Sequence, residues 1–367
     1  MKPTVQPKYR ASFVVDPALQ EGRIFDITNR SLNRDDCLYG FFALRNELLL
    51  LGIDLRTCDI CEPEKSDLIV FNERPKKGLE ADLRSKGLLK KSVLMIFESA
   101  LIRPDNWDLS FHKEVAAVLT WGSDLLSSKD SRAKYLRGGF THKFPNVIPG
   151  SDADHSAAGP APGEIGKRPK LVTLIAGNKS VSSPIELYTA RRDAIKWFET
   201  HAPSEFTYYG VGWEHSYLKG GFGTKVLRKL GILRHLPESR SKCFGGKVDS
   251  KLETMKQFDF SICFENAEKI PGYISEKIFD SFFAGCIPVY WGAPDIEEYI
   301  PAECFIDFRK FRDFEKLHRF LVMMTESEKR AYRNAIANFL KSDRARIFDA
   351  DLAAKDIALA IQSTVAT

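Results

Sequence analysis

The chain has 367 residues, a length typical of two domains rather than one. Its composition, 44% hydrophobic and 28% charged, is that of a globular protein and excludes a disordered or fibrous chain. The net charge of +5 is too small to indicate a nucleic-acid-binding protein by itself. Seven cysteines, an odd number in a long chain, do not indicate a disulfide framework.

No targeting or membrane-spanning pattern is visible in the sequence. Residues 1–10 are polar and have no apolar core of the kind that a secretory signal carries. The most apolar run, Phe41–Leu51, is too short to span a bilayer and is interrupted by Arg45, Asn46 and Glu47. We therefore expect a soluble, cytoplasmic protein whose cysteines stay reduced.

Strand and helix patterns alternate through the first half of the chain. The predicted helices are Asp35–Leu51, which ends before Gly52, and Ala81–Leu89. The predicted strands are Ser12–Val15, Asp67–Asn72, Ser92–Phe97 and Val115–Trp121. This β-α-β order is typical of a parallel sheet with helices on both faces.

Two short motifs, one of aspartates and one of cysteines, do not predict a metal site. The segment Pro149–Lys170 is rich in Gly, Pro, Ala and Asp, which indicates a linker or mobile loop. Its Asp152 and Asp154 form a D-x-D, but hard cations need rigidly placed oxygens. Cys58 and Cys61 form a lone C-x-x-C without a second ligand pair.

The second half repeats the alternation. A helix is predicted at Pro184–Thr200 and another at Ser275–Ala284, capped by Ser275 and stopped by Gly285. The predicted strands are Leu171–Ile175, Phe206–Tyr209, Phe258–Phe264, Ile287–Trp291 and Cys304–Phe308. We therefore predict an α/β protein with two Rossmann-like domains that face a cleft, where ligands bind beyond the carboxyl ends of the strands.

We place the first domain at residues 1–160 and the second at 168–345. Residues 346–367 form a predicted C-terminal helix that could pack back on the first domain.

One stretch, residues 225–247, is distinctly basic. It contains Lys225, Arg228, Lys229, Arg234, Arg240, Lys242 and Lys247, opposed only by Glu238. We interpret it as a helix with a solvated basic face; the alternative is peripheral contact with the inner face of a membrane. No nucleic-acid-binding motif accompanies the basic run, and aromatic residues are not interleaved with it, so no nucleic-acid partner is expected.

The chemistry is concentrated in the segment Phe258–Phe308. Its polar residues gather where a strand ends and the next helix begins: Glu265, Asn266, Tyr273, Glu276 and Lys277. A helix N-terminus presents free N–H groups and a positive dipole end, so an added lysine makes a plausible pyrophosphate site. The alternative is that Glu276 is a favourable first-turn acid and Lys277 a solvated charge.

This segment resembles the donor-binding motif of the family 10 α-1,3/1,4-fucosyltransferases. The matching runs are Phe264-Glu265-Asn266, Gly272-Tyr273-Ile274-Ser275-Glu276-Lys277 and Ala284-Gly285-Cys286-Ile287-Pro288-Val289-Tyr290-Trp291-Gly292. Phe97-Glu98-Ser99 and Arg191-Arg192 resemble two further family elements. The resemblance is strong over residues 170–311, patchy over 91–149 and weak before that, and the chain resembles the bacterial soluble forms.

The resemblance implies a GT-B fold and inverting transfer of L-fucose from GDP-β-L-fucose to a glycan hydroxyl, in α-1,3 or α-1,4 linkage. Glu98 would be the general base. Arg192, which fits the register better than Arg191, and Lys277 would neutralise the diphosphate, so no metal or other cofactor is expected. Tyr273 and Glu276 would orient the fucose or the ribose, and Asn266 would support the same loop.

Two other functions stay open. The motif alone does not identify guanine or fucose, so the donor could be another nucleotide sugar. The chain could also be a non-catalytic glycan- or nucleotide-binding protein, in which Glu98 is merely a strand-end carboxylate. The glycine runs at Gly210–Gly212 and Gly220–Gly223 fit close backbone approach to a nucleotide and tight turns equally well.

Overall fold

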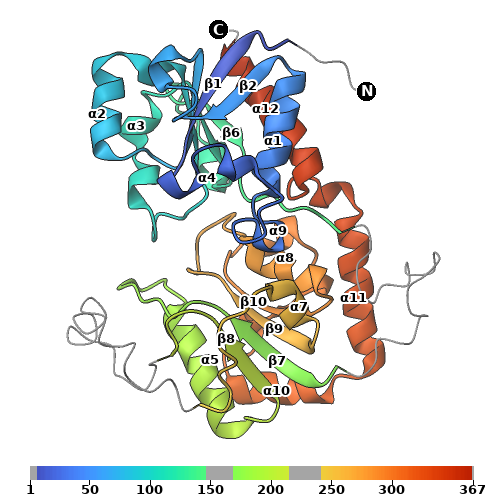
Figure 1. Ribbon diagram of the computed structural model, residues 1–367. Helices are drawn as coiled ribbons and strands as arrows, with labels where there is room; N and C mark the ends of the chain where they lie inside the picture. The colour runs from blue at the N-terminus through green and yellow to red at the C-terminus, as the bar shows by residue number, and fades with distance from the viewer. Residues whose placement is uncertain (1–5, 146–167, 215–240, 366–367) are drawn as a thin grey trace, which may run out of the picture.

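The computed structural model describes residues 6–145, 168–214 and 241–365. It contains two parallel sheets with helices packed on them, one above the other in Figure 1. The predicted α/β class is therefore confirmed. Asp152, Asp154, Gly220–Gly223 and the basic residues 225–240 lie outside the described residues.

The first sheet has the strand order β2-β1-β3-β4-β5-β6, all neighbours parallel. Its strands are β1 (Tyr9–Val14), β2 (Ile53–Thr57), β3 (Leu68–Asn72), β4 (Ser92–Met95), β5 (Ala117–Thr120) and β6 (Tyr135–Arg137). Helices α1 (Tyr39–Leu50) and α12 (Ala350–Val365) contribute to the core on one face. Helices α2 (Lys77–Ser85) and α3 (Leu109–His112) contribute to the core on the other. A short helix, α4 (Ser123–Leu126), follows β5.

Three details of the first domain differ from the sequence prediction. Strands β2 and β6 were not predicted, because these edge strands carry no continuous apolar run. Helix α1 begins at Tyr39 rather than Asp35, because Asp35 and Asp36 have φ angles of 52° and 58° and cannot join a right-handed helix. Helix α2 begins four residues before the predicted Ala81 and ends at Ser85, four residues before the predicted Leu89.

The second sheet has the order β11-β10-β9-β7-β8, again all parallel. Its strands are β7 (Lys170–Ile175), β8 (Phe206–Tyr209), β9 (Phe258–Phe264), β10 (Ile287–Trp291) and β11 (Ile306–Asp307). Helices α5 (Tyr188–His201) and α10 (Phe314–Met323) share one core with the sheet, and α8 (Glu276–Phe283) and α11 (Glu326–Leu340) share another. Two short helices complete this half, α7 (Lys251–Met255) and α9 (Ile296–Tyr299).

The end of the chain returns to the first domain. Helix α12 leaves the lower half beside α11 and runs along α1 in the upper half (Figure 1). Ala354, Ile357 and Ile361 are buried in the first sheet's core, and the Tyr39 hydroxyl donates to Asp351 at 2.8 Å. The two halves are therefore tied together by a second chain crossing. Within the described ranges, none of the helices has the length and apolar character needed to traverse a bilayer.

Candidate active site

The strand order locates the expected ligand site. In the second sheet β7, the first strand in the chain, has β8 on one side and β9 on the other. The strands that follow β9 continue on its side, so the direction of strand order reverses at β7. In doubly wound sheets ligands bind at this switch point, at the carboxyl ends of the strands. Here the switch point lies between β7 and β9, which end at Ile175 and Phe264.

A cavity of about 570 Å³ opens at this point and reaches the first domain. Its wall from the second domain is formed by the ends of β7, β8 and β9, the N-terminus of α8 and residues 247–251. Its wall from the first domain includes Arg34, Glu98 and Phe140. Next to Arg34, the Asp35 carboxylate accepts the Lys251 backbone N–H at 2.9 Å, which joins the two walls. We call this cavity the interdomain pocket.

Lys277 lies in the interdomain pocket within a network around a buried carboxylate. Glu265, which is fully buried, accepts the Ser275 N–H at 2.8 Å and the Ser275 hydroxyl at 2.7 Å. The Lys277 ammonium lies 3.3 Å from the same Glu265 carboxylate and 3.6 Å from Glu276. Burial by itself lowers the pKa of Lys277, but Glu265 and Glu276 raise it above the ordinary value, so Lys277 stays charged.

The predicted side-chain cap at Ser275 is wrong. Ser275 occupies the N-cap position of α8, but its hydroxyl is engaged by Glu265 and Lys277 instead of the helix N–H groups. The first N–H groups of α8 are therefore not covered by that side chain, and this helix end faces the pocket.

A second charged cluster lines the pocket and was not predicted. The Lys251 ammonium lies 2.8 Å from Asp280 and 3.9 Å from Glu276. Burial raises the pKa of Asp280 to about 6, and the Glu276 charge adds to this, while Lys251 acts in the opposite direction. Burial also acts against ionisation of Glu276, but Lys277 and Lys251 hold its pKa well below the usual range. The sequence signal was the i, i+4 spacing of Glu276 and Asp280 on one helix face.

The structure distinguishes the two adjacent arginines of α5. Arg191 is 4% exposed, lines the pocket, and donates to the Phe264 carbonyl at 2.6 Å and to Asn266 at 3.1 Å. Arg192 is not among the residues that line the cavity; it donates to the Lys179 carbonyl at 2.8 Å and to Thr189 at 2.9 Å. Sequence register favoured Arg192 for the diphosphate, whereas the helix turns Arg191 toward the pocket.

Asn266 and Tyr273 are brought together as expected for one loop. The Asn266 amide donates to the Tyr273 hydroxyl at 3.0 Å, and both residues line the interdomain pocket. The Tyr273 ring lies 5.0 Å from the ring of Trp121, which belongs to the first domain. Beside them, a Cβ on Gly272 would lie 2.5 Å from the Trp121 carbonyl oxygen, so only glycine permits this approach of the two domains. The loop that carries Tyr273 is therefore fixed by a contact between the two domains.

Glu98 faces this site from the first domain. It follows β4, and its carbonyl accepts the Trp107 indole N–H at 3.1 Å. Its Oε2 atom is buried and has no hydrogen-bond partner among the described residues. Burial raises the pKa of Glu98, the Glu73 charge raises it further, and Lys277 acts against both. A buried carboxylate with a free oxygen and a raised pKa is suited to accept a proton.

Gly210 lines the pocket at the end of β8 with a φ angle of 139°. A Cβ here would clash with the Ala176 carbonyl, so the backbone turn itself requires glycine. Gly212, with a φ angle of 87°, also has a left-handed backbone. For these two residues the tight-turn interpretation therefore has direct structural support, and Gly210 also brings backbone close to the cavity.

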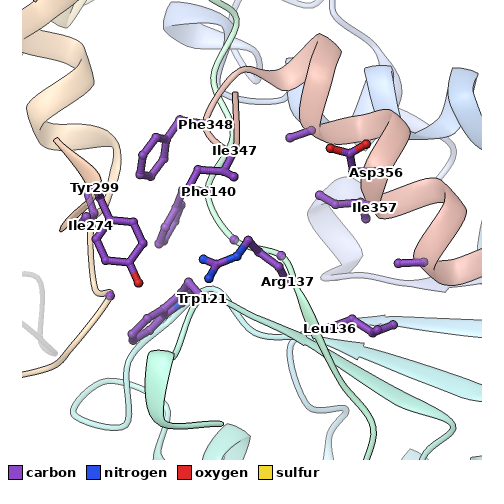
Figure 2. Close-up of a pocket in the computed structure, with 15 residues that line it drawn as sticks. Trp121, Leu136, Arg137, Phe140, Ile274, Tyr299, Ile347, Phe348, Asp356 and Ile357 are labelled. Carbon is purple, nitrogen blue, oxygen red and sulfur yellow. The ribbon is translucent and has the colours of Figure 1, made fainter. Parts of the chain in front are cut away.

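A separate cavity of about 290 Å³ lies between the first domain, α9 and α12. Figure 2 shows Trp121, Phe140, Tyr299 and Phe348 on one side of it and the Arg137 side chain pointing toward them. The lining is largely apolar and contains none of the predicted site residues. Within the described part of the chain, no group of three or more His, Cys, Asp and Glu is placed to hold a metal ion.

The family comparison covers the segment that contains Asn266, Tyr273, Glu276 and Lys277. Residues 238–336 match the family described as glycosyltransferase family 10 (fucosyltransferase), C-terminal region. The chain is 36% identical over 72 residues to the α-(1,3)-fucosyltransferase FucT of Helicobacter pylori, which covers 20% of this chain and 15% of that protein. It is 33% identical over 92 residues to 4-galactosyl-N-acetylglucosaminide 3-α-L-fucosyltransferase 9 of Mus musculus, covering 24% and 25%. The predicted resemblance is confirmed over this segment, although each match spans a quarter or less of these relatives' lengths.

Solved structures extend the likeness to the fold of the whole chain. An α1,3-fucosyltransferase crystallised with GDP aligns with a TM-score of 0.51 at 16% identity, over 100% of this chain and 92% of that one. HepE of Anabaena, crystallised with UDP-glucose, aligns with a TM-score of 0.51 at 14% identity, over 97% and 99%. At such identities the comparison concerns fold alone, and it confirms the predicted GT-B fold.

Proposed function

We propose, from the premise that residues 238–336 carry a family 10 fucosyltransferase segment, that this protein is an inverting glycosyltransferase. Its donor would be GDP-β-L-fucose and its acceptor a glycan hydroxyl, giving an α-1,3 or α-1,4 linkage. Glu98 would be the general base, and the cationic side chains of the second domain would neutralise the diphosphate.

One observation carries this proposal: a single cavity has on one wall the Glu98 carboxylate, whose Oε2 has no hydrogen-bond partner among the described residues, and on the other a helix N-terminus with a lysine. Six cationic residues line it: Arg34, Lys179, Arg191, Lys247, Lys251 and Lys277. Four carboxylate residues line it: Glu98, Asp249, Glu276 and Asp280. The lining thus carries two more cations than carboxylates when all are ionised, which suits an anionic diphosphate.

The proposed step is one in-line displacement. The acceptor oxygen attacks the anomeric carbon, its proton passes to the free oxygen of Glu98, and the bond from the anomeric carbon to the diphosphate oxygen breaks. Lys277 would stabilise the charge that develops on the leaving diphosphate. Arg191, which lines the pocket and is held by the Phe264 carbonyl, would add positive charge to this wall, whereas Arg192 would act only from outside the lining, beside Lys179. Tyr273, Glu276 and Asn266 would orient the donor sugar or its ribose.

The test is a product analysis with GDP-fucose and an array of acceptor glycans. We expect a fucosylated product whose linkage is read by mass spectrometry and NMR. If product forms from a different nucleotide sugar and none forms from GDP-fucose, the protein is a glycosyltransferase but GDP-fucose is not its donor. Tight nucleotide binding without turnover of any donor would instead support a binding protein and contradict the proposed transfer.

We expect transfer to continue in excess EDTA. The physical reason is that Lys277 and its neighbouring cations supply positive charge where the diphosphate would leave, which is the role a divalent metal plays in other transferases. The measurement is the initial rate with and without chelator at matched ionic strength. Complete loss of activity that manganese or magnesium restores would show that a metal is required.

A further inference from the structure

A second carboxylate, Glu73, lies directly behind Glu98 and is used by neither the sequence motifs nor the proposed transfer step. It follows β3, one strand over from the strand that precedes Glu98. Both side chains line a smaller cavity of about 300 Å³ between α1 and the strand ends. The question is what a second acid does beside the proposed base.

The Glu73 side chain is fully engaged with backbone and amide donors. One oxygen accepts the Phe97 N–H at 2.7 Å and the Glu98 N–H at 2.9 Å. The other accepts the side-chain amide of Asn106. Asn106 is itself fully buried; its Oδ1 accepts the Arg74 N–H at 2.8 Å, and its carbonyl is hydrogen-bonded to His112 at 2.7 Å. Glu73 therefore connects the turn that carries Glu98 to a buried, ordered support.

The backbone of Glu73 is in the left-handed region, with a φ angle of 72°. Such a conformation favours glycine and is strained for a residue with a Cβ. The local backbone therefore gives no reason for a glutamate at this position. The side chain gives the reason for a glutamate, since glycine would leave the Phe97 and Glu98 N–H groups without this acceptor.

The two carboxylates differ in what they are free to do. Three donors occupy the oxygens of Glu73, whereas Oε2 of Glu98 is buried and has no partner among the described residues. We propose that Glu73 is the positioning residue for Glu98: it holds the backbone of the proposed base and places a negative charge behind it. This inference rests on the proposed function only in naming Glu98 the base, because the contacts themselves do not depend on it.

The electrostatic consequence has a definite sign. Burial raises the pKa of Glu98, and the next contribution, from Glu73, raises it further. The other charges that face Glu98 are Glu276, which also raises its pKa, and Lys277 and Lys179, which lower it. The Arg103 guanidinium also faces both Glu73 and Glu98. Removing the Glu73 charge should therefore lower the pKa of Glu98 and weaken it as a base.

Two substitutions separate the effect of the Glu73 charge from the effect of its side-chain length. Glu73→Gln is nearly isosteric and neutral, so the pKa of Glu98 should fall. The acidic limb of the pH profile of kcat should then move to lower pH. Glu73→Asp keeps the charge but shortens the side chain. We expect the acidic limb of the pH profile to stay near its wild-type pH, and kcat to be about 10- to 100-fold lower because the base is misplaced. In both variants KM for the donor should stay close to wild type.

A second readout does not depend on turnover. The Glu98 carboxyl is titrated by ¹³C NMR, with its signal assigned by loss in Glu98→Gln. The control is Glu80→Gln, another buried carboxylate of this domain, which pairs with Arg74 at 2.6 Å and Arg84 at 2.8 Å; it should lower Tm and leave the Glu98 titration in place.

An unchanged Glu98 titration in folded Glu73→Gln would overturn the positioning role, even if the wild-type protein transferred no fucose. If Glu73→Gln does not fold, a folded Glu73→Asp variant with wild-type kcat would overturn it equally. Conversely, a shifted titration in a protein without transferase activity would support the Glu73–Glu98 coupling and contradict the proposed function instead.

Discussion

Glu98→Gln should bind GDP and GDP-fucose with near wild-type affinity and lose transfer, with kcat lower by roughly 10²–10⁴-fold. The amide has almost the same shape as the carboxylate but cannot accept the acceptor proton. Donor affinity should persist because the cationic residues that line the pocket come mainly from the second domain. Isothermal titration with GDP and steady-state rates with GDP-fucose measure the two effects separately.

The pH profile adds a second check on Glu98. The base works in its ionised form, so activity is lost as pH falls through the folded-state pKa of this carboxyl. Because burial and Glu73 raise that pKa, the acidic limb should lie above the range of an exposed glutamate. A raised pKa also means that ionised Glu98 destabilises the fold, and this cost grows as pH rises from the unfolded-state value through the folded one. Glu98→Gln should therefore have a Tm at neutral pH equal to or above wild type.

Two outcomes would contradict the assignment of Glu98. Wild-type transfer rates in Glu98→Gln would place the base elsewhere. Loss of GDP affinity would place the end of β4 in the donor site and reverse the division of labour between the domains. Glu114→Gln serves as the control, since Glu114 pairs with Arg84 at 2.6 Å and does not line the interdomain pocket.

Lys277→Ala should lower kcat/KM by an amount that corresponds to about 2–4 kcal/mol of transition-state stabilisation. The ammonium lies at the N-terminus of α8, where helix N–H groups and the lysine charge would act together on the leaving diphosphate. The raised pKa of Lys277 keeps this charge present across the neutral range. Steady-state kinetics with GDP-fucose measure the effect, and an unchanged kcat/KM would rule out the role.

A second variant of Lys277 is needed, because its contacts with buried groups also contribute to stability. Alanine would remove the cation that faces the buried Glu265, and losing one partner of a buried pair often destabilises a protein by about 3–5 kcal/mol. Lys277→Gln preserves a donor toward Glu265 without the charge, so it should fold better and still lose most of the transfer rate. Lys256→Ala is the matched control, because this lysine pairs with Glu253 and is not among the residues that line the pocket.

The donor-side elements could be predicted from the sequence because their determinants are local. Strand β9 is rich in phenylalanine and is buried along its whole length, and α8 follows a polar turn and ends before Gly285, whose φ angle is 66°. The order of polar residues between them indicated a site at a strand end and a helix N-terminus. The edge strands β2 and β6 escaped prediction, because neither carries a continuous apolar run.

The two arginines of α5 show where a sequence pattern stops being sufficient. Adjacent helical residues point about 100° apart, so a register shift of one decides which guanidinium reaches the neighbouring strand. Arg191 lies on the same face as the buried Ala194, Ile195 and Phe198 and reaches the Phe264 carbonyl. That orientation depends on how α5 packs on the sheet, and the contact joins residues 73 positions apart.

The sequence by itself determined the α/β class and the segment that resembles the family, because apolar runs, glycine stops and contiguous polar motifs act over a few residues. Glu98 was named as the base from the resemblance, and that role stays a prediction. Only the tertiary structure decided which charges meet: Lys277 with Glu265, Lys251 with Asp280, and Glu73 with the backbone of Glu98. The physical reason is that electrostatic and hydrogen-bond contacts depend on separation in space. In this fold, strand ends and helix termini that are distant in the chain converge on one interdomain pocket.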